Sequence, residues 1–402
     1  MPTLTLARPP AAAAVPLAPP PGQAPEPQLD EGLAPLRQLV TQVLGPQVLA
    51  IDLDAVYPEA FLHALGAAGG FRGAVPPEFG GSGLGLPHVI EVMALVSQTC
   101  LSTGFLTWCQ TACARYIAMS DNTELKRTLL PRIASGELLA GTGLSNTVKS
   151  CDAVEEFRLS ARRIDGGYLV NGVLPWVSNL GPDHVFTTGC PVEGAGPGDD
   201  GLAFLLVDCN APGFKLVDCA HFMAVDGTRT LACHFKNTFV PDAMVLSHPG
   251  QSKAYVRRIK PGMILGQMGM CLGLAQACVD LVHQSNRTHA HVNRHLDDQE
   301  DELAAEFAVL RERTAAAART LQANPLADIV LDILKLRLAG GELALRAAQS
   351  ALLHLGAKGY LQKSPAQRRV REAYFVAIVT PATKHLRREI ARLESGQAVC
   401  AA

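Results

Sequence analysis

The sequence lacks a strong excess of charge of either sign. Lysine and arginine number 35 against 37 aspartate and glutamate residues, which leaves a formal net charge of −2 at pH 7. Proteins that bind nucleic acid or anionic membranes carry clustered positive charge, and this sequence has no such excess of lysine and arginine. We therefore expect no nucleic-acid partner, and a small molecule or another protein as the ligand.

The chain also lacks an uninterrupted apolar stretch long enough to cross a bilayer. A membrane-spanning helix needs about 20 consecutive apolar residues. The apolar segment KPGMILGQMGMCLGLAQA is interrupted by Lys260 and Gln267. The sequence therefore predicts a globular protein that is not integral to a membrane.

Closely spaced cysteine pairs are absent as well. The chain has 11 cysteines but no CxxC motif, and they stand mostly inside apolar segments, as Cys271 and Cys278 do. This scatter is typical of reduced thiols that serve as small apolar residues in a cytoplasmic protein. Cys109 and Cys113 would share one face of a helix, but no further ligands stand beside them, and we predict no metal site.

The 402 residues suffice for two or three domains, and their periodicity changes along the chain. Residues 1–28 are Ala/Pro-rich and are interpreted as a disordered extension. Helical periodicity over 29–135 gives way to short alternating runs over 136–250 and returns over 251–402. The expected fold is α+β and multidomain: an N-terminal helical domain, a central β-barrel or sandwich, and a C-terminal four-helix bundle.

The segment Asp165–Gly181, DGGYLVNGVLPWVSNLG, carries the most informative local signal. Asp-Gly-Gly supplies the positive φ angles of a tight turn, and alternating runs flank it, so a β-hairpin is predicted. Trp176 then offers a rigid aromatic face, and Ser178 places a hydroxyl two residues further along the same side of the strand. Such a pair suits one wall of a planar cofactor site. The alternative is a tryptophan in the core of a sandwich.

Further motifs occur in a fixed order around this hairpin. Val75–Leu86 reads VPPEFGGSGLGL, Thr123–Glu137 combines TELK with LPRIASGE, and Phe235–Leu246 reads FKNTFVPDAMVL. Together with the tryptophan segment, these motifs resemble those of the acyl-CoA dehydrogenase superfamily of flavoproteins. The glycines at 80–85 follow no βαβ unit and are interpreted as turn residues. The resemblance implies an FAD-dependent oxidoreductase with the order of domains given above.

The resemblance also implies cofactor roles for particular residues. In the family an indole flanks the flavin isoalloxazine and a neighbouring hydroxyl reaches its N5 edge, and Trp176 and Ser178 stand at those positions. Ser145 and Asn146 correspond approximately to the segment that meets the pyrimidine ring. These four residues are therefore expected to contact FAD.

A neighbouring subunit completes the flavin site in the family. Arg287 in HQSNRTH is placed like the arginine that contributes to it, and the turn from Gly356 to Gly359 resembles the family's glycine-rich turn. A cation near the pyrophosphate and glycines that allow close backbone approach suit a diphosphate. The resemblance therefore implies a homodimer or homotetramer. The RxxFG consensus around the arginine is absent, and Leu353 replaces the usual glutamine.

The chain departs from the family at the catalytic base. Dehydrogenation of an acyl thioester needs a carboxylate that removes the α-proton while hydride passes to the flavin. Thr380 occupies the position of the usual glutamate, and the alternative position on the first bundle helix falls near Met263. A threonine hydroxyl is not a competent base without an activating neighbour. Asp226, Glu78 and His354 are alternative candidates for the base.

Three functions stay open on these residues. The first is oxidation of an acyl thioester, on coenzyme A or a carrier protein, with FAD and an electron-transfer partner. The second is a flavin-dependent monooxygenase on the same fold, supplied with reduced FMN or FAD by a flavin reductase. Val379–Pro381 keeps the proline of the triplet found in such enzymes but lacks its histidine, and His385 is expected to face away. The third is a non-catalytic flavin-binding or acyl-binding protein.

Overall fold

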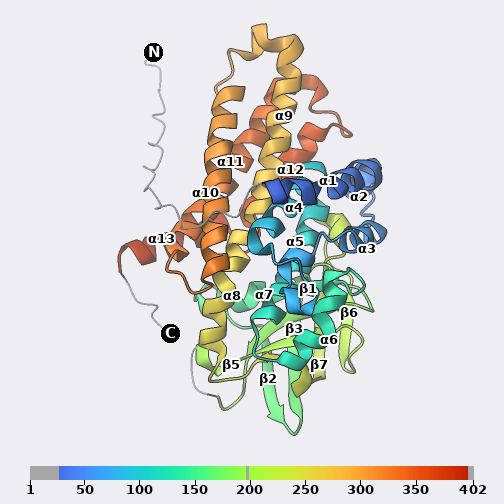
Figure 1. Ribbon diagram of the computed structural model, residues 1–402, viewed down its shortest axis with the longest axis vertical. Coiled ribbons are helices and arrows are strands. Elements are labelled where there is room, and N and C mark those ends of the chain that lie inside the picture. Colours follow the sequence, from blue (N-terminus) through green and yellow to red (C-terminus); the bar gives the residue numbers. More distant parts are fainter. Residues whose placement is uncertain (1–26, 196–198, 397–402) are drawn as a thin grey trace.

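The computed structural model describes residues 27–195 and 199–396 (Figure 1). Helices occupy both ends of the described chain and strands its middle, in the predicted order. The first helix begins at Pro27, so the last two residues assigned to the N-terminal extension are helical, and residues 1–26 lie outside the described ranges. In Figure 1 the strands lie at one end of the molecule, and the long C-terminal helices extend to the other end.

The N-terminal part is helical. Its helices are α1 (Pro27–Leu39), α2 (Val48–Leu53), α3 (Glu59–Ala67), α4 (Gly85–Thr99), α5 (Leu101–Met119) and α6 (Thr123–Ala134). Helix α5 is buried along nearly its whole length, because α4, α6 and later elements pack around it. Cys100, an extended residue with φ −146°, separates α4 from α5. Asn122 caps α6 by accepting a hydrogen bond from the Leu125 amide at 3.0 Å.

The central part contains two four-stranded sheets. One sheet has the order β1 (Ala140–Thr142), β4 (Val185–Pro191), β5 (Leu202–Asp208) and β8 (Val245–Ser247), and the other has β2 (Leu159–Ile164), β3 (Gly167–Val177), β7 (Leu231–Pro241) and β6 (Phe214–Val217). Phe186 of the first sheet and Phe235 of the second lie 6.2 Å apart between ring centroids, within one apolar core. This part is therefore a sandwich. Helix α7 (Leu144–Cys151) follows β1.

The predicted hairpin is confirmed. Strands β2 and β3 pair antiparallel, with Ile164 opposite Gly167, and Asp165 and Gly166 form the turn. Gly166 has φ +74°, a conformation that glycine adopts at no steric cost. Strand β3 continues past the end of β2 and pairs with β7, which brings Trp176 to the end of the sheet.

Helices return in the C-terminal part. They are α8 (Ser252–Gly266), α9 (Met268–Asn293), α10 (Glu300–Ala323), α11 (Val330–Leu355), α12 (Pro365–Ile378) and α13 (Thr383–Glu394). Helix α10 ends two residues before Pro325, and α12 begins at Pro365, because proline does not fit the interior of a helix. The stretch Ser252–Asn293 is long and apolar enough to cross a membrane, but 94% of its most apolar window is buried inside the protein, as in a core helix.

One sheet separates the helical core from the core of the sandwich. Along β5, Phe204 and Leu206 belong to the core shared with helices α4, α5 and α8 to α12, whereas Leu205 and Val207 belong to the core between the sheets. This alternation follows from the two faces of a strand. The sandwich is thus held against the helices, and the end of β3 lies at their junction.

Candidate functional site

A cavity of about 530 Å³ lies where the sandwich meets the helices. The sandwich side supplies residues of β1, α7 and β3, Ser178 after β3, and the loop between β6 and β7. The helical side supplies residues of α5, α8 and α12 and of the segment that follows α12. The described lining comprises Phe105, Trp108, Thr142, Leu144, Ser145, Val148, Lys149, Trp176, Ser178, Phe222, Met223, Ala224, Val225, Thr230, Met263, Arg371, Tyr374, Phe375, Ile378, Val379 and Thr380. The cavity therefore unites Ser145, Trp176, Ser178 and Thr380, four of the residues singled out in the sequence.

Trp176 forms an aromatic wall of this cavity. Its side chain stands at the end of β3 and is 59% exposed, so the alternative of a buried core tryptophan is wrong. Phe222 contacts it edge-on, with ring centroids 6.1 Å apart and an interplanar angle of 80°. Because most of its side chain is exposed at the cavity, the indole can offer a surface for a planar group to pack against.

Hydroxyl groups line the same side of the cavity. The Ser178 and Thr230 hydroxyls lie 2.6 Å apart, and the Thr228 hydroxyl lies 2.8 Å from that of Thr230. The buried Thr142 hydroxyl has no hydrogen-bond partner among the described residues. An aromatic face beside several hydroxyls suits a planar ring whose edge both donates and accepts hydrogen bonds, as a flavin does. The residues present therefore fit a flavin.

Ser145 and Thr380 meet across the cavity. Ser145 lies in the first turn of α7, and its hydroxyl lies 2.6 Å from the Thr380 hydroxyl. The Gln267 amide donates to the Thr380 carbonyl at 2.8 Å, and the buried Arg337 guanidinium donates to the Gln267 side-chain oxygen at 2.9 Å. The sequence analysis missed Gln267 and Arg337. A signal was present in Gln267, a polar residue inside an apolar segment.

Charged side chains in the described lining are Lys149 and Arg371, and both are paired. Lys149 contacts Glu155 at 2.8 Å, and Arg371 donates to Asp52 from both terminal nitrogens, at 2.9 and 2.5 Å. No aspartate, glutamate or histidine belongs to this part of the lining. The described lining therefore presents hydroxyls, but no carboxylate or imidazole, to a bound substrate.

Asn146 points away from the cavity, although the sequence predicts it beside the cofactor. Its buried amide donates to the Glu155 carboxylate at 2.7 Å and to the Glu156 carbonyl at 2.9 Å, and its oxygen accepts from the Arg158 amide at 2.9 Å. Burial raises the pKa of Glu155, but the hydrogen bonds from Asn146 and Lys149 outweigh it and hold that pKa below its usual value. The Asn146 side chain thus fixes the segment that leads into β2.

Arg287 and the glycine turn lie outside the cavity, at one end of the bundle. The Ser285 hydroxyl donates to the His354 carbonyl at 2.7 Å, which brings the arginine on α9 close to the turn after α11. Arg287 is exposed, and Gly356 has φ +54° in a place where an added Cβ would meet no described atom within 4 Å. Gly359 is buried and has an ordinary φ of −66°. Their expected role concerns a neighbouring subunit, so it stays a prediction.

The other candidates for the base do not line the cavity either. Asp226 accepts a hydrogen bond from the Phe222 amide at 2.7 Å and thereby shapes the adjacent loop. Glu78 is exposed in the turn after α3, and His354 is buried at the end of α11. His385 is buried against Asp152 instead. Among the described residues, Thr380 is the candidate for the base that reaches the cavity.

Comparison with known families identifies the class of protein. The family model described as "Acyl-CoA dehydrogenase, N-terminal domain" matches residues 30–137, and "Acyl-CoA dehydrogenase, C-terminal domain" matches residues 265–393. The chain is a flavoprotein oxidoreductase of the acyl-CoA dehydrogenase type. It belongs to the acyl-CoA dehydrogenase family, and its cofactor is a flavin, for which FAD is typical.

Relatives and solved structures agree with this assignment. The chain is 24% identical over 383 residues to mitochondrial isovaleryl-CoA dehydrogenase of Oryza sativa subsp. japonica, covering 88% of each chain. It is 22% identical over 359 residues to the probable acyl-CoA dehydrogenase FadE25 of Mycobacterium tuberculosis, covering 87% of this chain and 90% of that one.

Among solved structures, a glutaryl-coenzyme A dehydrogenase complex has a TM-score of 0.83 at 21% identity, over 95% of this chain and 98% of that one. Butyryl-CoA dehydrogenase from Megasphaera elsdenii also gives 0.83, at 17% identity over 93% and 100%. KijD3, solved with FMN and a dTDP-amino sugar, gives 0.78 at 20% identity over 93% and 96%. These likenesses confirm the predicted fold class.

Proposed function

We propose that this protein is an FAD-dependent oxidoreductase that oxidises the acyl group of a thioester on coenzyme A or a carrier protein. One observation carries the proposal: a single cavity joins the aromatic and hydroxyl-rich wall of the sandwich to an apolar pocket between helices. The first wall suits a flavin ring, and the second suits an acyl chain. The acyl-CoA dehydrogenases among the relatives support the choice of a thioester.

The apolar pocket lies between α5, α8 and α12. Phe105, Trp108, Met263 and Phe375 form it, and Trp108 closes its end. The Trp108 ring stacks on Phe105 with centroids 5.7 Å apart at 12°, and its indole nitrogen donates to the Met263 carbonyl at 3.3 Å. Because the Trp108 ring is held by stacking on Phe105 and by the hydrogen bond to Met263, it limits the length of the acyl group that the pocket can hold.

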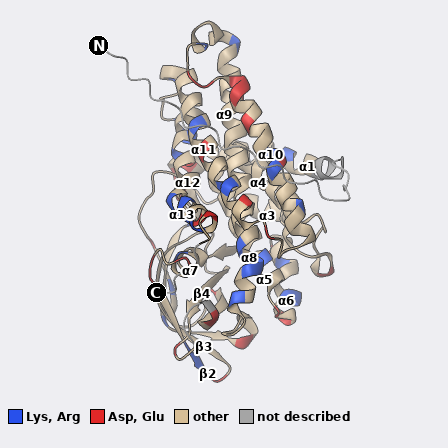
Figure 2. Ribbon diagram, turned by 90° about the vertical axis from the view of Figure 1, so that its left-hand side faces the viewer, with Lys and Arg blue, Asp and Glu red and all other residues tan. Residues whose placement is uncertain are grey.

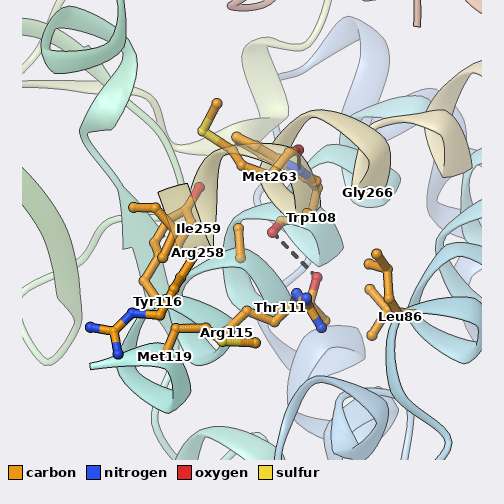
Figure 3. Close-up of a pocket in the computed structure, with 13 residues that line it drawn as sticks. Leu86, Trp108, Thr111, Arg115, Tyr116, Met119, Arg258, Ile259, Met263 and Gly266 are labelled. Atoms are coloured by element: carbon orange, nitrogen blue, oxygen red, sulfur yellow. Dashed lines mark hydrogen bonds between the residues drawn. The ribbon is translucent and has the colours of Figure 1, made fainter. Parts of the chain in front are cut away.

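A second, small cavity lies behind this wall (Figure 3). Trp108 and Met263 line both cavities, and the inner one, of about 10 Å³, continues between α5 and α8 as far as Arg115. Its volume is that of about one water molecule. Burial lowers the pKa of Arg115 to about 10. Trp108 therefore separates the acyl pocket from a half-buried cationic end.

Different side chains of the cavity would bind the flavin and the acyl group during oxidation. FAD, when bound, supplies the acceptor for the hydride. Trp176 and Ser178 would hold and orient its ring, and the acyl chain would lie beside Phe105 and Met263. The proton removed from the α-carbon would pass to solvent water, because the Ser145 and Thr380 hydroxyls can relay a proton but neither holds one at neutral pH.

Anaerobic mixing with a series of acyl-CoA thioesters tests this proposal. A substrate of the proposed class should bleach the visible absorption of the bound flavin, with one equivalent of enoyl product per flavin. A thioester that is merely bound perturbs the band without bleaching it. If no acyl-CoA and no acyl carrier protein bleaches the flavin, oxidation of acyl thioesters is not the function.

A second candidate function is a flavin-dependent monooxygenase. The specific observation in its favour is that no carboxylate or imidazole occurs in the described lining of the cavity. A reaction that does not remove a proton from an α-carbon has no need of such a group. Turnover with a flavin reductase under ¹⁸O₂ tests this alternative, because a monooxygenase places one labelled oxygen atom in its product.

The proposed assembly is a homodimer or homotetramer in the cytoplasm. Its support is the position of Arg287 and Gly356 at an exposed bundle end, outside the cavity of their own chain. Light scattering coupled to size exclusion measures the assembly, and Arg287→Ala should weaken flavin binding if the neighbouring subunit uses this arginine. A monomer that retains its flavin would contradict the shared site.

A further inference from the structure

A buried cluster of charged residues lies behind the cavity. Asp152 directly follows α7 and is only 8% exposed. Its carboxylate accepts hydrogen bonds from the Lys260 ammonium at 2.6 and 2.8 Å and from His385 Nε2 at 2.9 Å. The Asp152 carbonyl accepts a further bond from Arg388 at 2.6 Å. One residue therefore binds partners on two other helices, α8 and α13.

The three segments joined by Asp152 are those that bring the cavity residues together. Helix α7 carries Ser145 in its first turn and ends at Asp152. Helix α8 carries both Lys260 and Met263, which lie about one helical turn apart. Helix α13 begins at Thr383, just after Thr380. Figure 2 shows α13 beside α7 at the junction of helices and sandwich.

The charges of the cluster are balanced within it. Burial raises the pKa of Asp152, but the hydrogen bonds from His385 and Lys260 and the charge of Lys260 outweigh it, so that pKa lies below its usual value. Glu389 on α13 pairs with Arg392 at 2.9 Å. Ligand atoms of Asp152, His385 and Glu389 lie within 4.8 Å of one another, as in a metal site. Lys260 already contacts both Asp152 oxygens, so the group is an ion-pair cluster.

We propose that Asp152 is a positioning residue for the flavin and substrate cavity. It holds the end of α7 against α8 and α13, and this sets the contact between the Ser145 and Thr380 hydroxyls. Without the Asp152 charge, Lys260 would be left as a half-buried cation without its counter-charge beside His385, and the three helices would shift to hydrate it. The Ser145–Thr380 contact would then lengthen. This inference rests on the proposed flavin site and concerns residues that the flavin does not touch.

Asp152→Asn tests the proposal, because it keeps the shape of the side chain and removes its charge. A displacement of about 1 Å at a reacting group costs about 100-fold in rate, so kcat should fall about 10- to 100-fold with a small change in KM. The visible spectrum of bound flavin should change as well, since Ser145 moves relative to the ring. Asp152→Glu, which keeps the charge, should restore part of both signals.

Glu306→Gln is the matched control. Glu306 also forms a helix-to-helix ion pair, with Arg346 at 2.7 Å, but joins α10 to α11 and borders no part of the described cavity lining. It should lower the melting temperature without altering the flavin spectrum or kcat. If Asp152→Asn gives only the same loss of thermal stability, the cluster is merely structural and the proposal is wrong.

Two further measurements keep the test decisive. If Asp152→Asn does not fold, His385→Gln is tested in its place. The glutamine amide can still donate a hydrogen bond to Asp152, but it lacks the imidazole ring. A smaller change in the flavin spectrum is then expected. If the wild-type protein oxidises no thioester, the proposed substrate class fails, whereas the flavin spectrum and dissociation constant of the variants still test Asp152. An unchanged spectrum and dissociation constant in both variants would overturn the inference.

Discussion

The two walls of the cavity differ in what they offer to a bound substrate. The sandwich wall presents the exposed Trp176 side chain and the Ser178 hydroxyl, a combination that suits a planar ring with polar edges. The helical wall presents Thr380 where family members carry a glutamate, among apolar side chains and beside Arg371, which is paired with Asp52. In the proposed function, ring binding and proton removal would therefore fall to separate elements of the fold, and one could change while the other stays.

Restoring a carboxylate to the helical wall should have the largest effect. If the wall lacks only a base, Thr380→Glu should accelerate flavin reduction by acyl-CoA by about 100-fold or more, the contribution of a placed general base. Anaerobic stopped-flow absorption measures the rate. Thr380→Gln is the control, because it has the same size without basicity. Equal rates for the two variants would mean that proton removal does not limit this enzyme.

Removing the aromatic face tests the sandwich wall. Trp176→Ala should raise the flavin dissociation constant about tenfold, because a stacked aromatic contact contributes about 1.5 kcal/mol. Phe239→Ala is the control, since Phe239 is a part-exposed aromatic residue on β7 that does not belong to the described lining. Flavin fluorescence titration of the apoprotein measures both. Unchanged affinity in the Trp176 variant contradicts its assignment.

Opening the end of the apolar pocket sharpens the comparison further. Trp108→Ala should connect the outer and inner cavities and shift the preferred acyl group to longer chains, with a gain of about fourfold in kcat/KM per accommodated methylene, or about 0.8 kcal/mol. Trp108→Phe should keep the wild-type preference. A series from butyryl-CoA to dodecanoyl-CoA measures the shift, and an unaltered optimum in the alanine variant would show that Trp108 does not end the acyl pocket.

The smallest effect is expected for the charges on the sandwich side. Glu155→Gln removes the partner of Lys149 and should lower the free energy of unfolding by about 1 kcal/mol, because the pair is partly exposed. The folded pKa of Glu155 is lowered, so its stabilisation is complete above the usual value of 4.5 and is lost as the pH falls through the folded value. Urea unfolding of both proteins between pH 7 and pH 3 measures this. Flavin reduction should be unaffected.

The parts of this site that the sequence predicts depend on local patterns. The turn at Asp165-Gly166 and the strand after it bring Trp176 and Ser178 to the same cavity, although β3 ends at Val177 and its pairing with β7 shifts register just before that residue. Thr380, which stands at the position of the family's usual glutamate, also lies in the cavity. The succession of helices, strands and helices follows from hydrophobic periodicity in the same way.

The remaining features depend on pairs that are distant along the chain. The Asn146 side chain could donate to or accept from a cofactor, but its amide instead forms hydrogen bonds with the backbone of the segment before β2. The hydrophobic periodicity of the sequence does not predict these bonds. Arg371 pairs with Asp52 across 319 positions, and His385 meets Asp152 across 233. Such pairings are fixed by tertiary packing, so their partners cannot be chosen from one sequence by local rules.

The hydrogen bonds behind Thr380 have one consequence for the chemistry of the fold. Gln267 holds the main-chain oxygen of this position, and Arg337 in turn holds Gln267, so the location of the backbone does not depend on which side chain projects from it. Because the backbone is fixed at this position, a substitution can replace an acid by an alcohol, or an alcohol by another group, without changing the surrounding fold. The same position in the fold could then serve different reactions in different proteins.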